Sequence, residues 1–339
     1  MTGFRPRVLV VDDSAFARTV LARLLRASGK IDVVSTAHDG DDALERIAAL
    51  DPDVVTLDLT MPNVGGLDVL RALRGRARPR VIVVSISTVD TELAAEALML
   101  GAVDLVSKPT AVANDRLQDI GDELIAKVIA AAAGHVVRAA PALPRVVVSS
   151  ARAATLVMIG TSTGGPQALT RLMAALPASL AAPVAMVLHI PIGYTASLAQ
   201  RLDKLAALEV REAEDGLELR PGRVVLARGG MHLRIERVAD QLVARLGTMP
   251  LHPFTPSVDE LFMTGAAAVG DRALGVILTG MGDDGLAGAR VIAEAGGSLL
   301  TEAAATCVVY GMPRCVHEAG LGSIEVPLDL MAEEIVKRV

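Results

Sequence analysis

The stretch Gly160-Thr161-Ser162-Thr163-Gly164-Gly165-Pro166 places one hydroxyl at a predicted turn from a strand to a helix. The preceding run, Thr155–Ile159, is rich in strand formers, and Pro166 suits the first turn of a helix because the N–H it lacks would have no partner there. Backbone N–H groups of the glycines after Ser162 could stabilise a developing negative charge. The stretch fits the G-x-S-x-G nucleophile elbow, although a tight turn or a phosphate-binding loop is an alternative reading.

Apolar strands alternate with helical segments on both sides of this stretch. Towards the N-terminus the predicted strands are Arg7–Val11, Ile31–Ala37, Asp53–Leu57, Arg80–Ser85 and Val103–Val106. Towards the C-terminus, strands are predicted at Val184–Leu188 and Ala273–Leu278, with a β-hairpin region between them from about residue 209 to 246. The pattern predicts an α/β fold, with a doubly wound (βα)5 domain followed by an α/β domain that has a mainly parallel sheet.

Length and composition indicate two domains in a cytoplasmic protein. We place the domains at residues 5–133 and 154–339, joined by a linker at 134–153 that contains Pro141 and Pro144. Aromatic residues make up only 2% of the chain, so its cores must be aliphatic, and the net charge of −6 argues against nucleic-acid binding. Two cysteines form no disulfide framework, and neither a signal peptide nor a membrane insertion is expected.

Carboxylates, a hydroxyl and an ammonium group lie at strand ends of the first domain. Asp12 and Asp13 follow the first predicted strand and Asp58 follows the third, while Ser85 and Lys108 lie at two further strand ends. Because the carboxyl ends of parallel strands meet at one edge of a sheet, these groups should lie close together. Three carboxylates repel one another unless a cation lies between them, and hard oxygen ligands suit Mg²⁺. Such a site can accept a phosphoryl group, although Asp-Asp-Ser alone is a common helix cap.

This domain resembles the receiver domain of two-component response regulators over about residues 5–130. The shared motifs are Asp12-Asp13, Thr56-Leu57-Asp58, Met61-Pro62, Gly66-Leu67-Asp68, Ser85 and Lys108-Pro109. The resemblance implies that Asp58 accepts the phosphoryl group and binds Mg²⁺ together with Asp12 and Asp13. It also implies that Ser85 and Lys108 contact the phosphoryl group. The sequence departs from the family pattern at Thr60, Gly65 and Ile86.

A histidine and an acid follow two strands of the second domain. Of the six histidines, only His189 directly follows a strand that is predicted to be buried, so it should emerge at the same sheet edge as Ser162. Asp284 lies just before a predicted helix, where simple capping is the alternative. Serine, histidine and acid can act as nucleophile, base and orienting group. Their order differs from the Ser–Asp–His order of α/β-hydrolases, so the site would be a convergent one on another fold.

The second domain resembles the catalytic domain of the CheB chemotaxis protein-glutamate methylesterases. The shared motifs are Gly160–Pro166, His189–Thr195, Pro256–Phe262, Gly275–Gly285 and Val308–Pro313. With the receiver in front, the resemblance covers nearly the whole chain. It implies that Ser162 is the nucleophile, His189 the general base and acid, and Asp284 the orienting acid.

The same resemblance implies an oxyanion and substrate region next to the nucleophile. The resemblance places Thr163 and Met281 in this region, and we add Gly164 and Gly165 because their backbone N–H groups follow Ser162. The sequence departs from the family pattern at Leu188, Arg228 and Asp283. These departures bear on the fit of the substrate more than on the reaction.

The resemblance implies hydrolysis of glutamate γ-methyl esters on methyl-accepting chemoreceptors, with release of methanol. Some members of the family also deamidate receptor glutamines. Ester hydrolysis would need no cofactor, a chemotaxis histidine kinase would be the phosphodonor, and the enzyme would be recruited to receptor arrays. Phosphoryl transfer to Asp58 is expected to loosen a packing of the receiver over the Ser162 edge.

Two other readings of the sequence stay open. One is a receiver-linked adaptor or phosphoryl sink in a paralogous pathway, which needs Asp58 but not Ser162. The other is a serine hydrolase of small-molecule esters, which the scarcity of aromatic residues disfavours because such pockets are usually lined by aromatic side chains.

Overall fold

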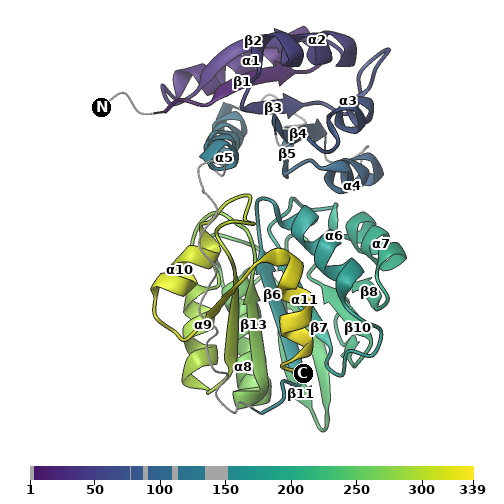
Figure 1. Cartoon of the computed structure of the whole chain (residues 1–339), viewed down its shortest axis with the longest axis vertical. Helices are drawn as coiled ribbons and strands as arrows, with labels where there is room; N and C mark the ends of the chain where they lie inside the picture. The colour runs from purple at the N-terminus through teal and green to yellow at the C-terminus, as the bar shows by residue number, and fades with distance from the viewer. Residues whose placement is uncertain (1–3, 77, 87–90, 109–113, 134–151) are drawn as a thin grey trace. The chain divides into compact units, whose positions relative to one another are not determined.

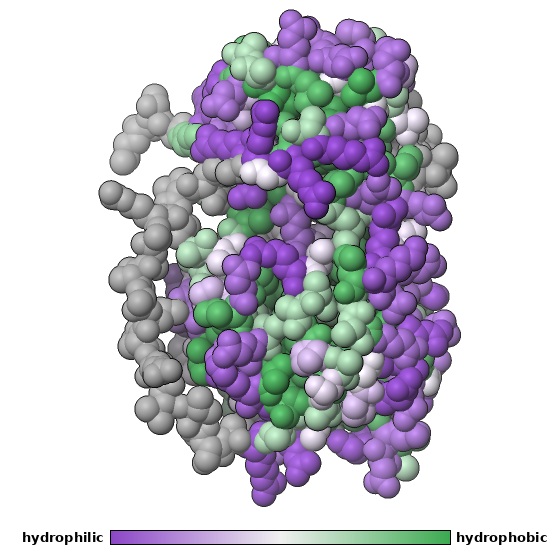
Figure 2. Space-filling model, turned by 45° about the vertical axis from the view of Figure 1, so that its right-hand side comes forward, coloured by the Kyte–Doolittle hydropathy of each residue, from purple (hydrophilic) through white to green (hydrophobic). Residues whose placement is uncertain are grey.

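The computed structural model describes residues 4–76, 78–86, 91–108, 114–133 and 152–339, and the side chains of residue 86 and residues 114–119 are outside the description. The chain divides into two compact units, Met1–His135 and Val136–Val339, which are described separately below. All but residues 152 and 153 of the predicted linker lie outside the described residues. Hydrophilic side chains cover much of the face that Figure 2 shows. No helix in the described part of the chain is both long and apolar enough to cross a membrane.

The first unit is a five-stranded parallel sheet in the order β2-β1-β3-β4-β5 (Figure 1). Its strands are β1 (Arg7–Val11), β2 (Asp32–Ala37), β3 (Val54–Leu57), β4 (Arg80–Ile86) and β5 (Asp104–Lys108). Its helices are α1 (Ala15–Ala27), α2 (Gly40–Leu50), α3 (Gly66–Leu73), α4 (Thr91–Leu100) and α5 (Asn114–Ala133). This strand order is that of a doubly wound fold, as predicted.

The predicted strands of this unit are confirmed, with one instructive difference in their ends. The central strands are apolar runs that are almost completely buried, which is typical of parallel sheets covered on both faces. Strand β4 ends one residue after the predicted Ser85, at Ile86, whereas β5 ends at Lys108, two residues after the predicted Val106. Both strands gain hydrogen-bonded pairs by this extension, including Ser85 with Ser107.

The second unit contains a seven-stranded parallel sheet and a three-stranded antiparallel sheet. The larger sheet has the order β15-β14-β13-β6-β7-β10-β8, and the smaller has the order β11-β12-β9. The strands are β6 (Leu156–Thr161), β7 (Val184–Leu188), β8 (Glu209–Glu212), β9 (Glu218–Leu219), β10 (Arg223–Leu226), β11 (His232–Val238), β12 (Gln241–Gly247), β13 (Ala273–Ile277), β14 (Ser298–Glu302) and β15 (Ile324–Val326). The helices are α6 (Gly165–Ala175), α7 (Thr195–Leu205), α8 (Val258–Val269), α9 (Leu286–Glu294), α10 (Met312–Glu318) and α11 (Leu328–Val336), with a 3₁₀ turn at Gly270–Arg272.

Strand β6 lies between β13 and β7 at the centre of the larger sheet (Figure 1). Thr161 pairs with Leu188 of β7, and Gly160 pairs with Ile277 of β13. The three strands therefore end at the same level, and the residues that follow them meet at one edge of the sheet. This register, together with the antiparallel β11–β12 pair, confirms the predicted mainly parallel domain with a β-hairpin region.

Candidate active site and phosphoryl-acceptor site

The turn after β6 carries Ser162, whose residue is only 8% exposed. The N–H of Gly165 donates to the Ser162 carbonyl at 2.7 Å and closes the turn into helix α6. Gly164 has a φ of +83°, and a Cβ on it would lie 2.5 Å from Cβ of Val308. The turn therefore requires glycine at position 164 for both conformation and space. The Gly165 N–H closes the turn in this structure, and the assignment of Gly165 to the oxyanion region stays a prediction.

Thr279, which follows β13 by two residues, holds the nucleophile turn from the neighbouring strand. Its carbonyl accepts the N–H of Ser162 at 3.1 Å and the hydroxyl of Thr161 at 2.7 Å. Its own hydroxyl donates to the Thr163 carbonyl at 2.9 Å. The fully buried Glu302 accepts the Thr279 N–H at 2.8 Å. Hydrogen bonds to Thr279, in the segment that directly follows β13, thus fix the main chain of the Ser162 turn.

His189 directly follows β7, and its N–H donates to the Thr161 carbonyl at 3.1 Å. Its Nε2 lies 2.7 Å from Oδ2 of Asp284, and a carboxylate can only accept, so Nε2 carries the proton. The other nitrogen, Nδ1, is buried and has no hydrogen-bond partner among the described residues. Ser162 and His189 follow the paired residues Thr161 and Leu188 of adjacent strands, so this unpaired nitrogen belongs to the residue beside Ser162.

Asp284 is completely buried as a side chain and accepts hydrogen bonds from the start of helix α8. Its Oδ2 accepts from His189 and from the Val258 N–H at 2.7 Å. Its Oδ1 accepts from the Ser257 hydroxyl at 2.9 Å and from the Asp259 N–H at 3.1 Å. Burial alone would raise the pKa of this carboxyl, but its hydrogen bonds with His189 and the two amides outweigh burial and lower the pKa to about 2. The carboxylate is therefore charged and held in place beside His189.

An aromatic ring that the sequence reading missed lies against His189. Phe254 stacks on His189 with ring centroids 4.4 Å apart and an interplanar angle of 5°. The loop that carries Phe254 is held by the buried His232, which accepts the Ser257 N–H at 3.2 Å and lies 3.0 Å from the Pro250 carbonyl. Burial lowers the pKa of His232, which keeps this imidazole neutral. Phe254 shields one face of His189 from water, as expected for a proton-transfer site.

A pocket of about 280 Å³ lies beside the acid. Its lining residues are His252, Pro253, Phe254, Asp259, Asp283, Asp284, Leu286, Ala287 and Arg290. His252, Asp259 and Asp284 each offer one possible metal-ligand atom within 4.8 Å of the others. However, both oxygens of Asp284 and one oxygen of Asp259 already accept two hydrogen bonds each. We therefore read this cluster as support for the acid and not as a metal centre.

The low pKa of Asp284 makes the catalytic unit sensitive to acid. The pKa of Asp284 is about 2 in the folded chain, against an ordinary 3.8. The charged carboxylate therefore contributes about 2 kcal/mol to the free energy of unfolding. This contribution is complete above about pH 4 and is lost as the pH falls towards 2. Both tyrosines, Tyr194 and Tyr310, lie in the second unit, Val136–Val339, so tyrosine fluorescence reports on the unfolding of this unit alone. Between about pH 6 and pH 3, the free energy of unfolding in urea should fall by about 1 kcal/mol more in the wild type than in Asp284→Asn. An equal fall in the free energy of unfolding of both proteins would contradict the lowered pKa of Asp284.

The predicted acidic site lies at one edge of the receiver sheet. Asp12, Asp13 and Asp58 each place one carboxylate oxygen within 4.8 Å of the others. Lys108 Nζ lies 2.6 Å from Oδ2 of Asp58 and 2.7 Å from Oδ2 of Asp12. Arg18 of helix α1, which the sequence reading missed, donates to the Asp12 carbonyl at 2.6 Å and to the Asp13 carbonyl at 2.9 Å. A donor set of three carboxylates fits Mg²⁺, which prefers oxygen ligands.

Burial and charge shift the two central groups of this site. Burial raises the pKa of Asp58, and the hydrogen bond from Lys108 offsets only part of this effect. Burial opposes the charged form of Lys108, but hydrogen bonds to Asp12 and Asp58 raise its pKa overall. Ser85 is completely buried in β4 and not exposed at its end. The predicted site residues Asp12, Asp13, Asp58 and Lys108 are therefore brought together.

The departures from the family pattern have local partners. Leu188 is buried, and its Cδ1 would lie 2.7 Å from a Cβ on Gly165, so it packs beneath the nucleophile turn. Arg228 Nε donates to Oε2 of Glu212 at 3.2 Å. Asp283 is exposed, and its carbonyl accepts the Leu286 N–H at 3.0 Å, which begins helix α9. None of the three replaces a contact of Ser162, His189 or Asp284.

Comparisons with known proteins identify the families of the two domains. Residues 157–335 match the CheB methylesterase family, and residues 8–120 match the response regulator receiver domain. A protein-glutamate methylesterase/protein-glutamine glutaminase of Myxococcus xanthus is 56% identical over 340 residues, which cover 98% of this chain and 97% of that protein. A protein of the same name from Symbiobacterium thermophilum is 44% identical over 352 residues, with 98% and 97% covered.

A solved structure supports the catalytic fold. The Thermotoga maritima CheB methylesterase catalytic domain is 38% identical to this chain, with a TM-score of 0.54. The match covers 55% of this chain and 99% of that domain. Because relatives match this chain along almost their whole length, the chain belongs to the CheB methylesterase family. It carries a response regulator receiver domain in front of the catalytic domain.

Proposed function

We propose that this chain is a phosphorylation-regulated serine hydrolase that removes γ-methyl esters from glutamate side chains of chemoreceptors and releases methanol. The observation that carries the proposal is the 2.7 Å contact between His189 and Asp284 beside Ser162, in a member of the CheB family. Chemoreceptors are accordingly the proposed partners, and a chemotaxis histidine kinase is the proposed phosphodonor.

The first half of the reaction forms an acyl-enzyme. His189 Nδ1 takes the proton of the Ser162 hydroxyl while Oγ attacks the ester carbonyl carbon. Asp284 stabilises the imidazolium that results, because its charge lies 2.7 Å from Nε2. The tetrahedral intermediate then expels the methoxy group, which leaves as methanol with the proton from Nδ1. One C–O bond has formed and one has broken, and the receptor glutamate is now esterified to Ser162.

The second half of the reaction repeats these steps with water. His189 removes a proton from water, whose oxygen attacks the acyl carbon, and the proton is returned to Ser162 as the acyl bond breaks. We place the oxyanion beside the nucleophile turn, with Thr163, Gly164 and Met281 as the residues around it. The close approach of Gly280 to Ser162 supports this placement, because a Cβ on Gly280 would lie only 3.0 Å from the Ser162 Cβ.

The receiver residues support regulation by phosphorylation of Asp58. When bound, Mg²⁺ would supply charge neutralisation for the incoming phosphoryl group, held by Asp12, Asp13 and Asp58. Lys108 already lies 2.6 Å from Asp58, so its ammonium group can pair with a phosphoryl oxygen. Ser85, at the adjacent strand, is the proposed second contact. Phosphorylation replaces the single negative charge of the Asp58 carboxylate by a phosphoryl group that carries about two.

Deamidation of receptor glutamine is a second activity of the same site. Relatives that match this chain along their length are named as protein-glutamine glutaminases as well as methylesterases. A primary amide differs from a methyl ester only in its leaving group, so Ser162 and His189 would act as above and ammonia would leave in place of methanol. Both reactions yield glutamate.

Methanol release from methylated receptor membranes tests the proposal. With acetyl phosphate and Mg²⁺, we expect the wild type to be stimulated by about 5-fold to 150-fold, the usual range of coupling between two sites. Asp58→Asn should show no stimulation, because an amide cannot accept the phosphoryl group. The control is Asp68→Asn, which removes an exposed acid of helix α3 that pairs with Arg71. Phosphorylation without any methanol release would favour the adaptor or phosphoryl-sink alternative.

A further inference from the structure

We infer that Asp259 is a positioning residue for the hydrolase reaction. It holds the catalytic acid Asp284 through hydrogen bonds that run from α8 to α9 and from α9 to α8. The inference rests on the proposed function of Ser162, His189 and Asp284. Asp259 lies in the shared motif Pro256–Phe262, which by itself assigns it no role, and its role as a positioning residue follows from its hydrogen bonds.

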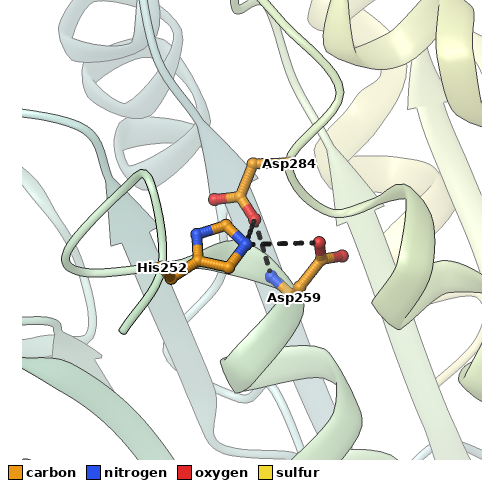
Figure 3. Close-up of side chains that lie close together, drawn as sticks. All are labelled: His252, Asp259 and Asp284. Carbon is orange, nitrogen blue, oxygen red and sulfur yellow. Dashed lines mark hydrogen bonds and ion pairs between the residues drawn. The ribbon is translucent and has the colours of Figure 1, made fainter. Parts of the chain in front are cut away.

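Asp259 contacts both Asp284 and Gly285, the residue that follows Asp284 in the chain. Figure 3 shows the main-chain nitrogen of Asp259 pointing at the Asp284 carboxylate, and this N–H donates to Oδ1 at 3.1 Å. In the opposite direction, Oδ1 of Asp259 accepts the N–H of Gly285 at 3.0 Å and that of Gly288 at 2.7 Å. The catalytic acid is therefore held both at its carboxylate and at the peptide next to its own Cα.

This arrangement is a reciprocal capping of two helices. Asp284, just before α9, accepts the first N–H groups of α8, while Asp259, in the first turn of α8, accepts the first N–H groups of α9. Helix N-termini carry partial positive charge and unpaired N–H groups, so each carboxylate is stabilised where it lies. Gly288 lets the helices approach, because a Cβ on it would lie 2.5 Å from Cβ of Phe262. A shift of α8 relative to α9 would consequently move Asp284 away from His189.

The electrostatics of the pair fit this role. Burial and then the nearby charge of Asp284 raise the pKa of Asp259, while the hydrogen bonds from Gly288 and Gly285 oppose the rise. His252 Nε2 lies 3.9 Å from an oxygen of each carboxylate, as Figure 3 also shows, and faces the pair from the loop before α8. The N–H groups of Gly285 and Gly288 are thus the nearest groups that stabilise the charge of Asp259 beside Asp284.

Replacing Asp259 by alanine and by asparagine separates its hydrogen bonds from its charge. Asp259→Ala removes both accepted hydrogen bonds, so we expect kcat for methanol release to fall by about 10²-fold with little change in KM, the cost typical of a misplaced catalytic group. Asp259→Asn keeps a carbonyl oxygen for Gly285 and Gly288, and it should restore kcat to within about fivefold of the wild type. Labelling of Ser162 by a fluorophosphonate, which needs no receptor, should follow the same order.

Glu260→Gln is the matched control, because Glu260 lies in the same helical turn but pairs with Arg234 at 3.0 Å. Tyrosine fluorescence checks the fold of each variant. If Asp259→Ala does not fold, Asp259→Glu takes its place, since one extra methylene misplaces the acceptor and should lower kcat at least about tenfold. Wild-type kcat in Asp259→Ala, or equal losses in the alanine and asparagine variants, would overturn the inference. Absence of methanol release from the wild type itself would instead refute the proposed function.

Discussion

Ser162→Ala should lower methanol release from methylated receptors by about 10⁶-fold, the loss found when a serine hydrolase loses its nucleophile. The neighbouring Thr161 hydroxyl should not take its place, because it donates to the Thr279 carbonyl at 2.7 Å. The turn itself should persist, since its hydrogen bonds use the main chain of Ser162 and not its hydroxyl. Headspace measurement of methanol over receptor membranes, with and without acetyl phosphate, is the assay.

The matched control is Ser179→Ala, which removes an exposed hydroxyl from the loop after helix α6 in the same domain. It should release methanol at the wild-type rate. Fluorophosphonate labelling should be lost in Ser162→Ala and kept in Ser179→Ala, while phosphorylation of Asp58 should be the same in both. Methanol release that continues in Ser162→Ala would refute the nucleophile assignment.

The strand ends of the fold could be predicted because apolar runs and polar residues change abruptly there. Ser162, His189 and Asp58 each follow a buried parallel strand, and parallel strands bring their carboxyl ends to one edge. The end of β5 was less predictable, because Ser107 and Lys108 are polar residues that the hydrogen-bonded ladder still includes. Apolarity marks burial, whereas a strand ends where its pairing ends.

The supports of the catalytic acid could not be predicted from the sequence. Asp259 lies two residues after Ser257, a pattern typical of an ordinary helix N-terminus. Helix α8 does begin there, since the Ser257 hydroxyl accepts the Glu260 N–H. Its contacts with Gly285 and Gly288 join residues far apart in the chain, and local periodicity contains no information on such pairs. Phe254 was missed for the same reason, because only the fold brings its ring onto His189.

Asp284→Asn is the second variant with a large expected effect, a loss of about 10⁴-fold in kcat, as when the orienting acid of a serine hydrolase becomes an amide. All four partners of the Asp284 carboxylate are donors: His189 and the Val258 N–H on Oδ2, and the Ser257 hydroxyl and Asp259 N–H on Oδ1. An amide turned either way sets its own NH₂ group against two of them. If the NH₂ group faces His189, the imidazole must present Nε2 as an acceptor, and the proton moves to Nδ1.

In that tautomer Nδ1 cannot accept the proton of Ser162, so kcat should fall while KM for the receptor stays nearly constant. Asp283→Asn is the control, because this exposed neighbour carries the same change one residue earlier and makes no contact with His189 among the described residues. Fluorophosphonate labelling of Ser162 should slow in Asp284→Asn and stay unchanged in Asp283→Asn. If the two variants lost activity equally, the acid would act through the general negative charge of the loop, and the tautomer argument would be wrong.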